Sequence, residues 1–330
     1  MTLLKPPKLQ RGDTIGIVAT SFPLPRNEFP DSSYIQEYKI AIQELENMGF
    51  KVKEGKNLNR VKWWFAGTAQ ERATDINEMF TDPEVKAIMV HEGGQSAIAV
   101  LELIDYELVK KHPKPFIGFS DVTNIHIALH AQTGLVGFHG PLLTYSLGKI
   151  WEKYLPDKKE EGKSRLLNML TSDKPAGVIS PFTEWQCWKE GEAEGTLFGG
   201  NLGNLASLVG TKYFPKLDDI QNSILFWEID NVPSYRIEKG LYQLKYAGIL
   251  DCISGMLVGK LPDIKRTAWE GLQEPTLKEI VLETLKDYSF PIIGEVDFGH
   301  KTVDTPMPIG IRAKMIAKEL RLEFLEAAVQ

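Results

Sequence analysis

The fold of this chain is decided by the stretch AIMVHEGGQS, which runs from Ala87 to Ser96. An apolar run without polar alternation ends here in a double glycine, and apolar residues at helical spacing follow from Ala97 to Ile104. The pattern predicts a buried strand, a tight turn and a helix. Ser96 falls at the turn, where its hydroxyl would lie at the carboxyl edge of a sheet near the free N–H groups of a helix. Ser96 is therefore a candidate nucleophile; the alternative is that it only caps the helix.

The residues around this stretch alternate between predicted strands and predicted helices. Strands are expected at 14–19, 50–52, 87–90 and 115–119, and helices at 34–48, 68–80, 97–104 and 124–132. This order predicts a parallel sheet covered by helices on both faces, which is an α/β architecture. The strand at 115–119 would deliver Ser120 and Asp121 to the same sheet edge as Ser96.

The length of 330 residues exceeds what one hydrophobic core usually supports, so two domains are expected. We place an N-terminal α/β domain at 1–150, a connecting segment rich in charge and proline at 151–190, and a C-terminal domain at 191–330. Within the last, 195–202 is interpreted as a glycine-rich turn, 237–244 and 277–285 as helices, and 224–229, 253–258 and 291–296 as strands. A terminal hairpin at 309–314 and 320–325 follows, with a helix at 319–329 as the alternative to its second strand.

Composition excludes several classes of function. Acidic residues outnumber basic ones by 44 to 38, which disfavours a nucleic-acid partner. No apolar run is long enough for a membrane span, and Cys187 and Cys252 are too few for a disulfide framework, so a cytoplasmic protein is expected. His126 and His130 are one helical turn apart, but no zinc motif surrounds them, and the sequence predicts neither a metal nor a cofactor.

Two further side chains stand at predicted strand ends. Glu228 lies in an apolar strand, where a carboxylate costs several kcal/mol unless it has a partner. His300 follows the strand at 291–296. A serine nucleophile needs a histidine base, and the histidine needs a carboxylate that fixes its tautomer, so Ser96, His300 and Glu228 supply one residue for each role. The alternatives are a two-domain binding protein in which Glu228 pairs with Arg236 or a lysine, and, less favoured, a metal-dependent hydrolase.

Six sequence blocks, taken in order, resemble one family, the LD-carboxypeptidase and microcin C self-immunity family of serine peptidases. The blocks lie at 93–96 (GGQS), 117–123 (IGFSDVT), 138–141 (FHGP), 198–202 (FGGNL), 226–228 with 235–237 (FWE and YRI), and 298–300 with 308–310 (FGH and PIG). The resemblance implies a flavodoxin-like N-terminal domain with a parallel sheet, a C-terminal domain of mixed strands and helices, a site between them, and a homodimer.

The resemblance also implies residue roles. It places the nucleophile on Ser96, the orienting acid on Glu228 and the base on His300. The backbone amides of Gly94 and Asp121 are the expected oxyanion hole. The alternative for Asp121 is that its side chain only caps its own helix.

Two substrate classes divide the family. One branch releases D-alanine from murein tetrapeptides, and the other cleaves peptidyl or aminoacyl adenylates such as processed microcin C. An adenylate needs a flat surface for its adenine, and Trp185 and Trp188, together with Trp63 and Trp64, are candidates for it. We therefore expect an enzyme of the immunity type, with a murein carboxypeptidase as the alternative, and in either case a small peptide or peptidyl-nucleotide as the partner.

Overall fold

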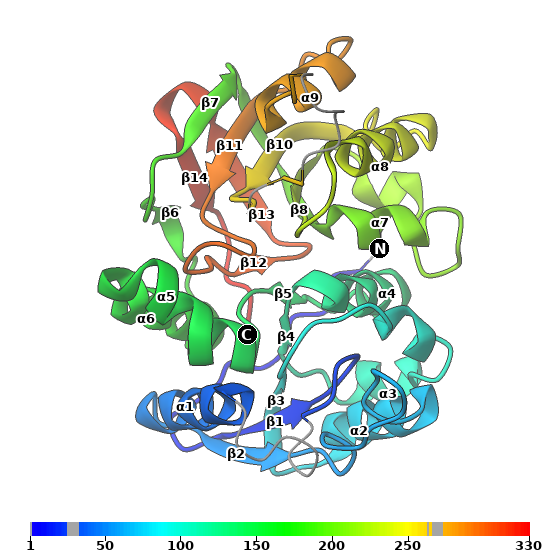
Figure 1. Ribbon diagram of the computed structural model, residues 1–330, viewed down its shortest axis with the longest axis vertical. Coiled ribbons are helices and arrows are strands. Elements are labelled where there is room, and N and C mark those ends of the chain that lie inside the picture. The colour runs from blue at the N-terminus through cyan, green and yellow to red at the C-terminus, as the bar shows by residue number, and fades with distance from the viewer. Residues whose placement is uncertain (1, 25–32, 263, 266–272) are drawn as a thin grey trace.

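The computed structural model of the chain describes residues 2–24, 33–262, 264–265 and 273–330. Two sheets lie one above the other, and the chain crosses between them more than once (Figure 1). The expected α/β class, with a parallel sheet in the N-terminal part and a mixed sheet in the C-terminal part, is confirmed.

The N-terminal sheet has the strand order β12-β5-β4-β3-β1-β2. Its strands are β1 (Thr14–Val18), β2 (Lys51–Glu54), β3 (Val85–Val90), β4 (Phe116–Gly118), β5 (Phe138–His139) and β12 (Met307–Pro308). β1 to β5 are parallel in the flavodoxin-like order 2-1-3-4-5, and β12 joins β5 in the antiparallel direction. The C-terminal part of the chain thus completes the N-terminal sheet.

Helices lie on both sides of this sheet (Figure 1). They are α1 (Ser33–Asn47), α2 (Ala69–Thr81), α3 (Tyr106–Lys111) and α4 (Thr123–Thr133). α2 starts where the sequence predicts, because Thr68 and Glu71 form a reciprocal capping box. The predicted helix at 97–104 is wrong in kind: only a 3₁₀ turn forms at Ala97–Val100, and the next helix begins at its own cap, Asp105.

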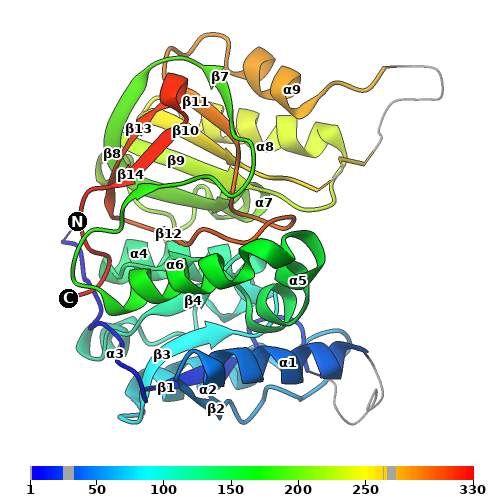
Figure 2. The same ribbon diagram turned by 90° about the vertical axis from the view of Figure 1, so that its left-hand side faces the viewer.

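A π-helical stretch (Leu143–Ile150) leads into the connecting segment, which contains α5 (Trp151–Tyr154) and α6 (Lys159–Thr171). α6 lies alongside the junction of the two sheets (Figure 2). The two ends of the chain meet on the same side, where the amide of Lys8 donates to the Gln330 carbonyl at 2.9 Å. The segment and the termini together tie the two halves of the molecule.

The C-terminal sheet has the order β6-β14-β13-β8-β9-β10-β11-β7. Its strands are β6 (Gly177–Ile179), β7 (Gln186–Lys189), β8 (Glu192–Asn201), β9 (Ser223–Glu228), β10 (Ile253–Gly259), β11 (Ile292–Val296), β13 (Arg312–Ile316) and β14 (Arg321–Phe324). β8 to β11 run parallel, whereas β7, β13, β14 and β6 pair antiparallel. The predicted terminal hairpin is therefore confirmed as β13 and β14.

The helices α7 (Leu202–Leu208), α8 (Ser234–Tyr246) and α9 (Leu277–Thr284) accompany this sheet. The expected glycine-rich turn at 195–202 is wrong, because 195–201 form the second part of β8 and Leu202 begins α7. Glycine is needed there for close packing rather than for a turn: a Cβ at Gly199 would lie 1.8 Å from the Phe226 carbonyl oxygen of β9. β8 and β9 thus reach the junction side by side.

Candidate active site

Ser120 comes two residues after the end of β4 and begins a short 3₁₀ turn that leads into α4. Its φ of +62° is in the left-handed region, which is unusual for a residue other than glycine. Such strain at a sharp strand-to-helix turn is the feature that exposes the nucleophile in serine hydrolases. Gly118 makes the turn possible, because a Cβ there would press on Val122 and Val90 at 3.2 Å.

Ser120, His300 and Glu228 form a connected row. Ser120 Oγ lies 3.1 Å from His300 Nε2, and His300 Nδ1 lies 2.5 Å from Glu228 Oε2. An ionised carboxylate can only accept, so Nδ1 carries the proton and Nε2 of the neutral ring is left to accept the Ser120 O–H. Serine, histidine and acid therefore stand in the order that general-base activation requires.

Glu228 ends β9 with its side chain fully buried. Asn201, its neighbour at the end of β8, donates from Nδ2 to Oε1 at 3.1 Å, and His300 takes the other oxygen. The buried acid therefore has its partners, and they are His300 and Asn201 rather than Arg236.

Glu228 and His300 each shift the pKa of the other. Burial would raise the pKa of Glu228, but the charge and hydrogen bond of His300 outweigh it and hold the pKa below its usual range. Burial would likewise lower the pKa of His300, yet the Glu228 carboxylate raises it above the ordinary histidine value. Glu228 is therefore an ionised partner that stabilises the imidazolium formed when Ser120 gives up its proton.

His300 lies in the loop between β11 and β12, and buried polar contacts hold this loop. Asp304 accepts from the Gly299 amide at 3.1 Å and from Ser146 Oγ at 3.1 Å, while Tyr145 donates its hydroxyl to the His300 carbonyl at 3.1 Å. The ring of Phe119 packs edge-on against the imidazole with 4.7 Å between centroids. The imidazole is thus positioned by the N-terminal half of the chain.

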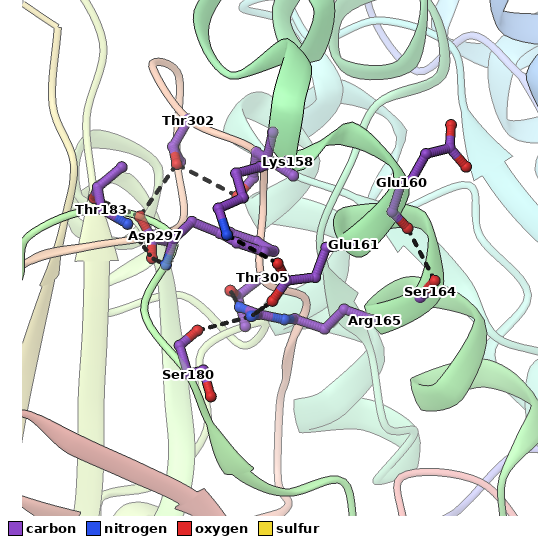
Figure 3. A network of polar contacts seen from close by, with 12 residues as sticks. Lys158, Glu160, Glu161, Ser164, Arg165, Ser180, Thr183, Asp297, Thr302 and Thr305 are labelled. Carbon is purple, nitrogen blue, oxygen red and sulfur yellow. Dashed lines mark hydrogen bonds and ion pairs between the residues drawn. The ribbon is translucent and has the colours of Figure 1, made fainter.

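Asp297 and Thr305, at the two ends of the same loop, fasten it to the connecting segment (Figure 3). Asp297 is fully buried and accepts from Thr183 Oγ1 at 2.6 Å. Arg165 of α6 donates to Thr305 Oγ1 at 2.6 Å and to the Ser180 carbonyl at 2.7 Å. The loop that carries His300 is therefore fastened both to α6 and to the residues between β6 and β7.

The structure does not bring Ser96 to His300, contrary to the expectation from sequence. Ser96 Oγ instead accepts from Nη2 of the buried Arg72 at 2.9 Å. Nor does its side chain cap the 3₁₀ turn that follows. The sequence correctly places Ser96 and Ser120 at the same sheet edge, but it is Ser120 whose hydroxyl meets the histidine.

The glycine turn after β3 lies against Ser120. A Cβ on Gly93 would make a tight contact with Ser120, 3.3 Å from its Cβ and 3.4 Å from its Oγ. A Cβ on Gly94 would overlap Ser21, 2.3 Å from its Oγ, so Gly94 has no room for a side chain. Ser21 Oγ accepts the amides of Gln95 and Ser96 at 2.9 and 2.8 Å. The backbone of the turn is therefore fixed beside the Ser120 hydroxyl.

Asp121 secures this turn from the other side. Its Oδ2 accepts the amides of Ser96 and Ala97 at 2.7 and 2.8 Å, so the side chain caps the 3₁₀ turn and not its own helix. The amide of Asp121 follows Ser120 in the first turn of a helical segment, where amides have no acceptor within the segment. Asp121 thus combines a structural side chain with a backbone donor beside the reacting hydroxyl.

The expectation that Trp185 and Trp188 offer flat surfaces to a ligand is contradicted by their burial. Trp185 is 2% exposed and donates from Nε1 to Asp297 Oδ2 at 2.8 Å. Trp188 is 7% exposed, donates to Gln186 Oε1 at 3.0 Å, and packs on Gly294, where a Cβ would overlap its ring. Both rings are packing residues. Trp63 and Trp64, by contrast, are 74% and 61% exposed.

Other candidate groups are buried in structural roles. His126 Nε2 lies 2.8 Å from the Gly118 carbonyl oxygen and His130 Nδ1 lies 3.3 Å from that of Leu135, so neither ring turns toward the other as a ligand pair would. Among the described residues, no group of three or more His, Cys, Asp or Glu side chains is arranged to hold a metal ion. In the same residues, no helix combines the length and the apolar character of a membrane span.

Sequence reasoning missed Ser120, Asn201, Arg72 and Ser21 as site residues. Gly118-x-Ser120 after a buried strand is half of the nucleophile-elbow pattern, and it was the available signal for Ser120. Gly94-x-Ser96 carries the same half pattern, so the pattern does not separate the two serines. Asn201 lies in the block at 198–202 that resembles the family. Arg72 and Ser21 have no sequence feature that distinguishes them from structural residues.

Known proteins resemble this chain over most of its length. The LD-carboxypeptidase N-terminal domain family matches residues 15–140, and the LD-carboxypeptidase C-terminal domain family matches residues 194–315. A probable murein peptide carboxypeptidase of Bacillus subtilis is 35% identical over 326 residues, covering 98% of this chain and 95% of the relative.

Two solved structures have the same fold over nearly the whole chain. Microcin C7 self-immunity protein MccF in complex with aspartyl sulfamoyl adenosine is 25% identical, with a TM-score of 0.84 and coverage of 99% of this chain and 100% of that chain. Muramoyltetrapeptide carboxypeptidase from Oxalobacter formigenes is 26% identical, with a TM-score of 0.75 and coverage of 94% and 97%. This chain therefore belongs to the LD-carboxypeptidase family and is a serine-type carboxypeptidase.

Proposed function

We propose that Ser120 is the nucleophile of this carboxypeptidase, His300 its general base and Glu228 the acid that orients the base. The observation that carries the proposal is the row of contacts from Ser120 Oγ through both ring nitrogens of His300 to Glu228. The assignment keeps the expected acid and base and moves the nucleophile from Ser96 to Ser120.

The reaction follows from this arrangement. Ser120 Oγ attacks the carbonyl carbon of the scissile amide while His300 Nε2 takes the hydroxyl proton. The tetrahedral intermediate then breaks its C–N bond, and His300 returns the proton to the leaving amine. A water molecule, deprotonated by the same nitrogen, hydrolyses the acyl-enzyme and restores the Ser120 hydroxyl.

The amides of Gly94 and Asp121 are the proposed oxyanion hole. Support comes from the two turns that flank Ser120: the Asp121 amide is next to it in the chain, and the glycine turn after β3 approaches its hydroxyl. The Gly93 amide already donates to Glu92 Oε1 at 3.2 Å, which favours Gly94 as the donor from this turn.

The substrate class that we favour is a murein tetrapeptide, from which the enzyme would release the terminal D-alanine. The Bacillus subtilis relative, 35% identical over nearly the full length of both chains, supports this class. The burial of Trp185 and Trp188 removes the aromatic argument for an adenylate that the sequence offered at those positions.

A second candidate is an aminoacyl or peptidyl adenylate-like compound, which is the substrate of the immunity type. It is favoured by the similarity to MccF in complex with aspartyl sulfamoyl adenosine. The exposed rings of Trp63 and Trp64 also leave flat apolar surface for a base to stack on.

Hydrolysis of a murein tetrapeptide and of aspartyl sulfamoyl adenosine, followed side by side by chromatography, tests these proposals. We expect the tetrapeptide to be cleaved with release of D-alanine, and cleavage to be lost in Ser120→Ala but kept in Ser96→Ala. Cleavage of the adenylate alone would establish the second candidate. Activity that survives Ser120→Ala would refute the nucleophile.

We also propose that the chain forms a homodimer in the cytoplasm, as the family resemblance implies. Light scattering of the purified protein measures the mass directly. A mass near 74 kDa, twice the 37.1 kDa of the chain, is expected, and a monomer at micromolar concentration would contradict the assembly.

A further inference from the structure

Two carboxylates that the proposed mechanism does not use lie beside the catalytic row. Glu92 stands between the end of β3 and Gly93, and Asp230 follows Glu228 by two residues. Glu92 follows β3 of the N-terminal sheet and Asp230 follows β9 of the C-terminal sheet. Asp230 Oδ2 lies 3.9 Å from His300 Nε2, and the charge of His300 also acts on Glu92. Neither has a role as acid, base or nucleophile in the reaction described above.

Glu92 is linked to the backbone that touches Ser120. Its Oε1 accepts from the Gly93 amide at 3.2 Å, and its Oε2 accepts from the Tyr34 hydroxyl at 3.3 Å. The side chain is partly exposed, and a carboxylate has room for about four donors, so it retains capacity for another. Within the described part of the chain, no lysine or arginine forms an ion pair with it.

The lysine whose charge acts on Glu92 forms its ion pair with another residue. Lys149 acts on Glu92 only at a distance, since its ammonium pairs with Glu37 at 3.2 Å. Burial raises the pKa of Glu92 to about 7, and the hydrogen bonds from Gly93 and Tyr34 oppose this only in part. A carboxylate in this position lacks the cation that would normally compensate its burial.

Asp230 lies on the Nε2 side of the imidazole, where substrate must also lie. Its Oδ2 is 3.9 Å from His300 Nε2, and its side chain is 42% exposed. No other ion pair or hydrogen bond of this side chain is formed with the residues that the structure describes. Asn231, which follows, has a left-handed φ of +48°, so the backbone that presents Asp230 is tightly turned.

We propose that Glu92 and Asp230 select substrates that carry a protonated amine on the acyl side of the scissile amide. This proposal rests on the proposed function, in which Ser120 attacks beside these groups. Among the described residues neither carboxylate forms an ion pair with a lysine or an arginine, and two such carboxylates attract an ammonium group and repel an anion. The leaving D-alanine carries its own carboxylate, so the amine belongs to the acyl part of the substrate.

Both substrate candidates offer such an amine. A tetrapeptide with a diamino acid next to D-alanine carries it at the end of a side chain, and an aminoacyl adenylate carries it on the α-carbon. The shared chemistry is a primary ammonium a few bonds from the reacting carbonyl, and acetylation removes its charge in each case.

The test uses four compounds: a tetrapeptide ending in L-lysyl-D-alanine, its Nε-acetyl form, aspartyl sulfamoyl adenosine and its Nα-acetyl form. In the wild-type enzyme we expect kcat/KM for an amine to exceed that for its acetylated partner by about tenfold, the effect of one well-placed charge pair. Glu92→Gln and Asp230→Asn should each reduce this ratio, mainly by raising KM for the amine. The two compound pairs distinguish a side-chain amine from an α-amine.

Glu102→Gln is the matched control, because it removes one negative charge from a side chain that is 77% exposed and pairs only weakly with Lys212 at 3.7 Å. It should leave the ratio at the wild-type value. Asp230→Asn, at a half-exposed site, serves as the second variant if Glu92→Gln fails to fold. Equal rates for amine and acetylated compounds, or a ratio that both variants leave unchanged, would overturn the proposal.

Calorimetric binding of the same compounds to Ser120→Ala separates this inference from the proposed function. If Ser120→Ala binds the amines more tightly than their acetylated forms but the wild type cleaves none of the compounds, the selection of amines is supported and the proposed reaction is refuted. Turnover of the compounds by the wild type, without preferential binding of the amines, would support the proposed reaction and refute the selection. Neither binding nor turnover of any compound would refute both.

Discussion

Ser120 differs from Ser96 in its backbone conformation as well as in its side-chain contacts. Its φ of +62° places it in a region that costs a residue with a Cβ about 1–3 kcal/mol, whereas Ser96 has a φ of −140°. The surrounding turn maintains this strain: Gly118 packs on Val122 and Val90, and Phe119 packs on His300. The strained residue is the one whose hydroxyl reaches the base.

The protonation of His300 sets the pH at which the site works. Burial lowers its pKa, and the charges of Glu228 and then Asp230 raise it to a net value above the usual range. The base acts only when neutral, so kcat/KM should fall as the pH drops through this raised pKa. Asp230→Asn removes one of the raising charges, and the acid limb of the pH profile should therefore move to lower pH.

The measurement is kcat/KM against pH for the wild type, Asp230→Asn and the remote control Glu102→Gln. The control should keep the wild-type profile. An acid limb that stays in place or moves to higher pH in Asp230→Asn would show that Asp230 does not act on the base.

At the scale of elements, the turn after β3 and the turn after β4 are built as one unit. Ser21 holds the amides of Gln95 and Ser96, and Asp121 holds those of Ser96 and Ala97. Burial raises the pKa of Asp121, but these amide hydrogen bonds oppose the rise and favour its charged form. The donors around Ser120 are therefore fixed before any substrate arrives.

Gly94→Ala should damage this unit. The added Cβ would lie 2.3 Å from Ser21 Oγ and would also sit at a φ of +148°, so Ser21 must move and release the amides that it holds. Loss of an aligned oxyanion donor lowers kcat by about 10²–10³, and we expect a decrease of this order with little change in KM.

The matched control is Gly210→Ala, at a φ of +83° with nothing within 4 Å of the added Cβ. This variant carries backbone strain alone and should lose stability by about 1 kcal/mol while keeping kcat. A Gly94→Ala enzyme with wild-type kcat would exclude this turn from the oxyanion hole.

Most elements could be predicted from apolar spacing, but the choice between the two serines could not. A Gly-x-Ser lies at the same sheet edge after each of two strands: Gly94-x-Ser96 in the turn after β3, and Gly118-x-Ser120 at the end of β4. The difference lies in a backbone angle and in a histidine 180 residues away along the chain, and neither can be read from local sequence. For a similar reason the sequence of Gly199 and Gly200 suggested a turn. Glycine is needed at these positions because a Cβ would overlap Phe226 and Thr123, which belong to other elements.

At the scale of the whole molecule, the catalytic row depends on the junction of the two sheets. Ser120 belongs to the N-terminal sheet and Glu228 to the C-terminal one, and His300 lies on the loop that returns from the second sheet to the first. Asp297 and Thr305 anchor that loop to the connecting segment (Figure 3). The family resemblance implied a site between the two domains, but it gave no information on how the loop is held.

Trp185→Phe tests the anchor. It deletes the N–H that donates to the buried Asp297, and a hydrogen bond to a charged group contributes about 1.5–3 kcal/mol, so the free energy of unfolding should fall by about 2 kcal/mol. The ring is buried, so KM for either substrate class should not change. Urea unfolding and steady-state kinetics measure the two quantities.

Trp188→Phe is the companion variant, since its N–H donates to the neutral side chain of Gln186. Its loss should be smaller, about 1 kcal/mol, again without an effect on KM. A rise in KM confined to the adenylate in either variant would restore the tryptophans as substrate contacts and contradict their role as packing residues.

The central claim is that Ser120, not Ser96, is the nucleophile. Labelling with a fluorophosphonate probe, read by mass spectrometry in the wild type, Ser120→Ala and Ser96→Ala, tests it most directly. We expect one phosphonyl group on the peptide that contains Ser120, no labelling of Ser120→Ala, and labelling of Ser96→Ala at a rate close to that of the wild type. Labelling that persists in Ser120→Ala and disappears in Ser96→Ala would contradict the account.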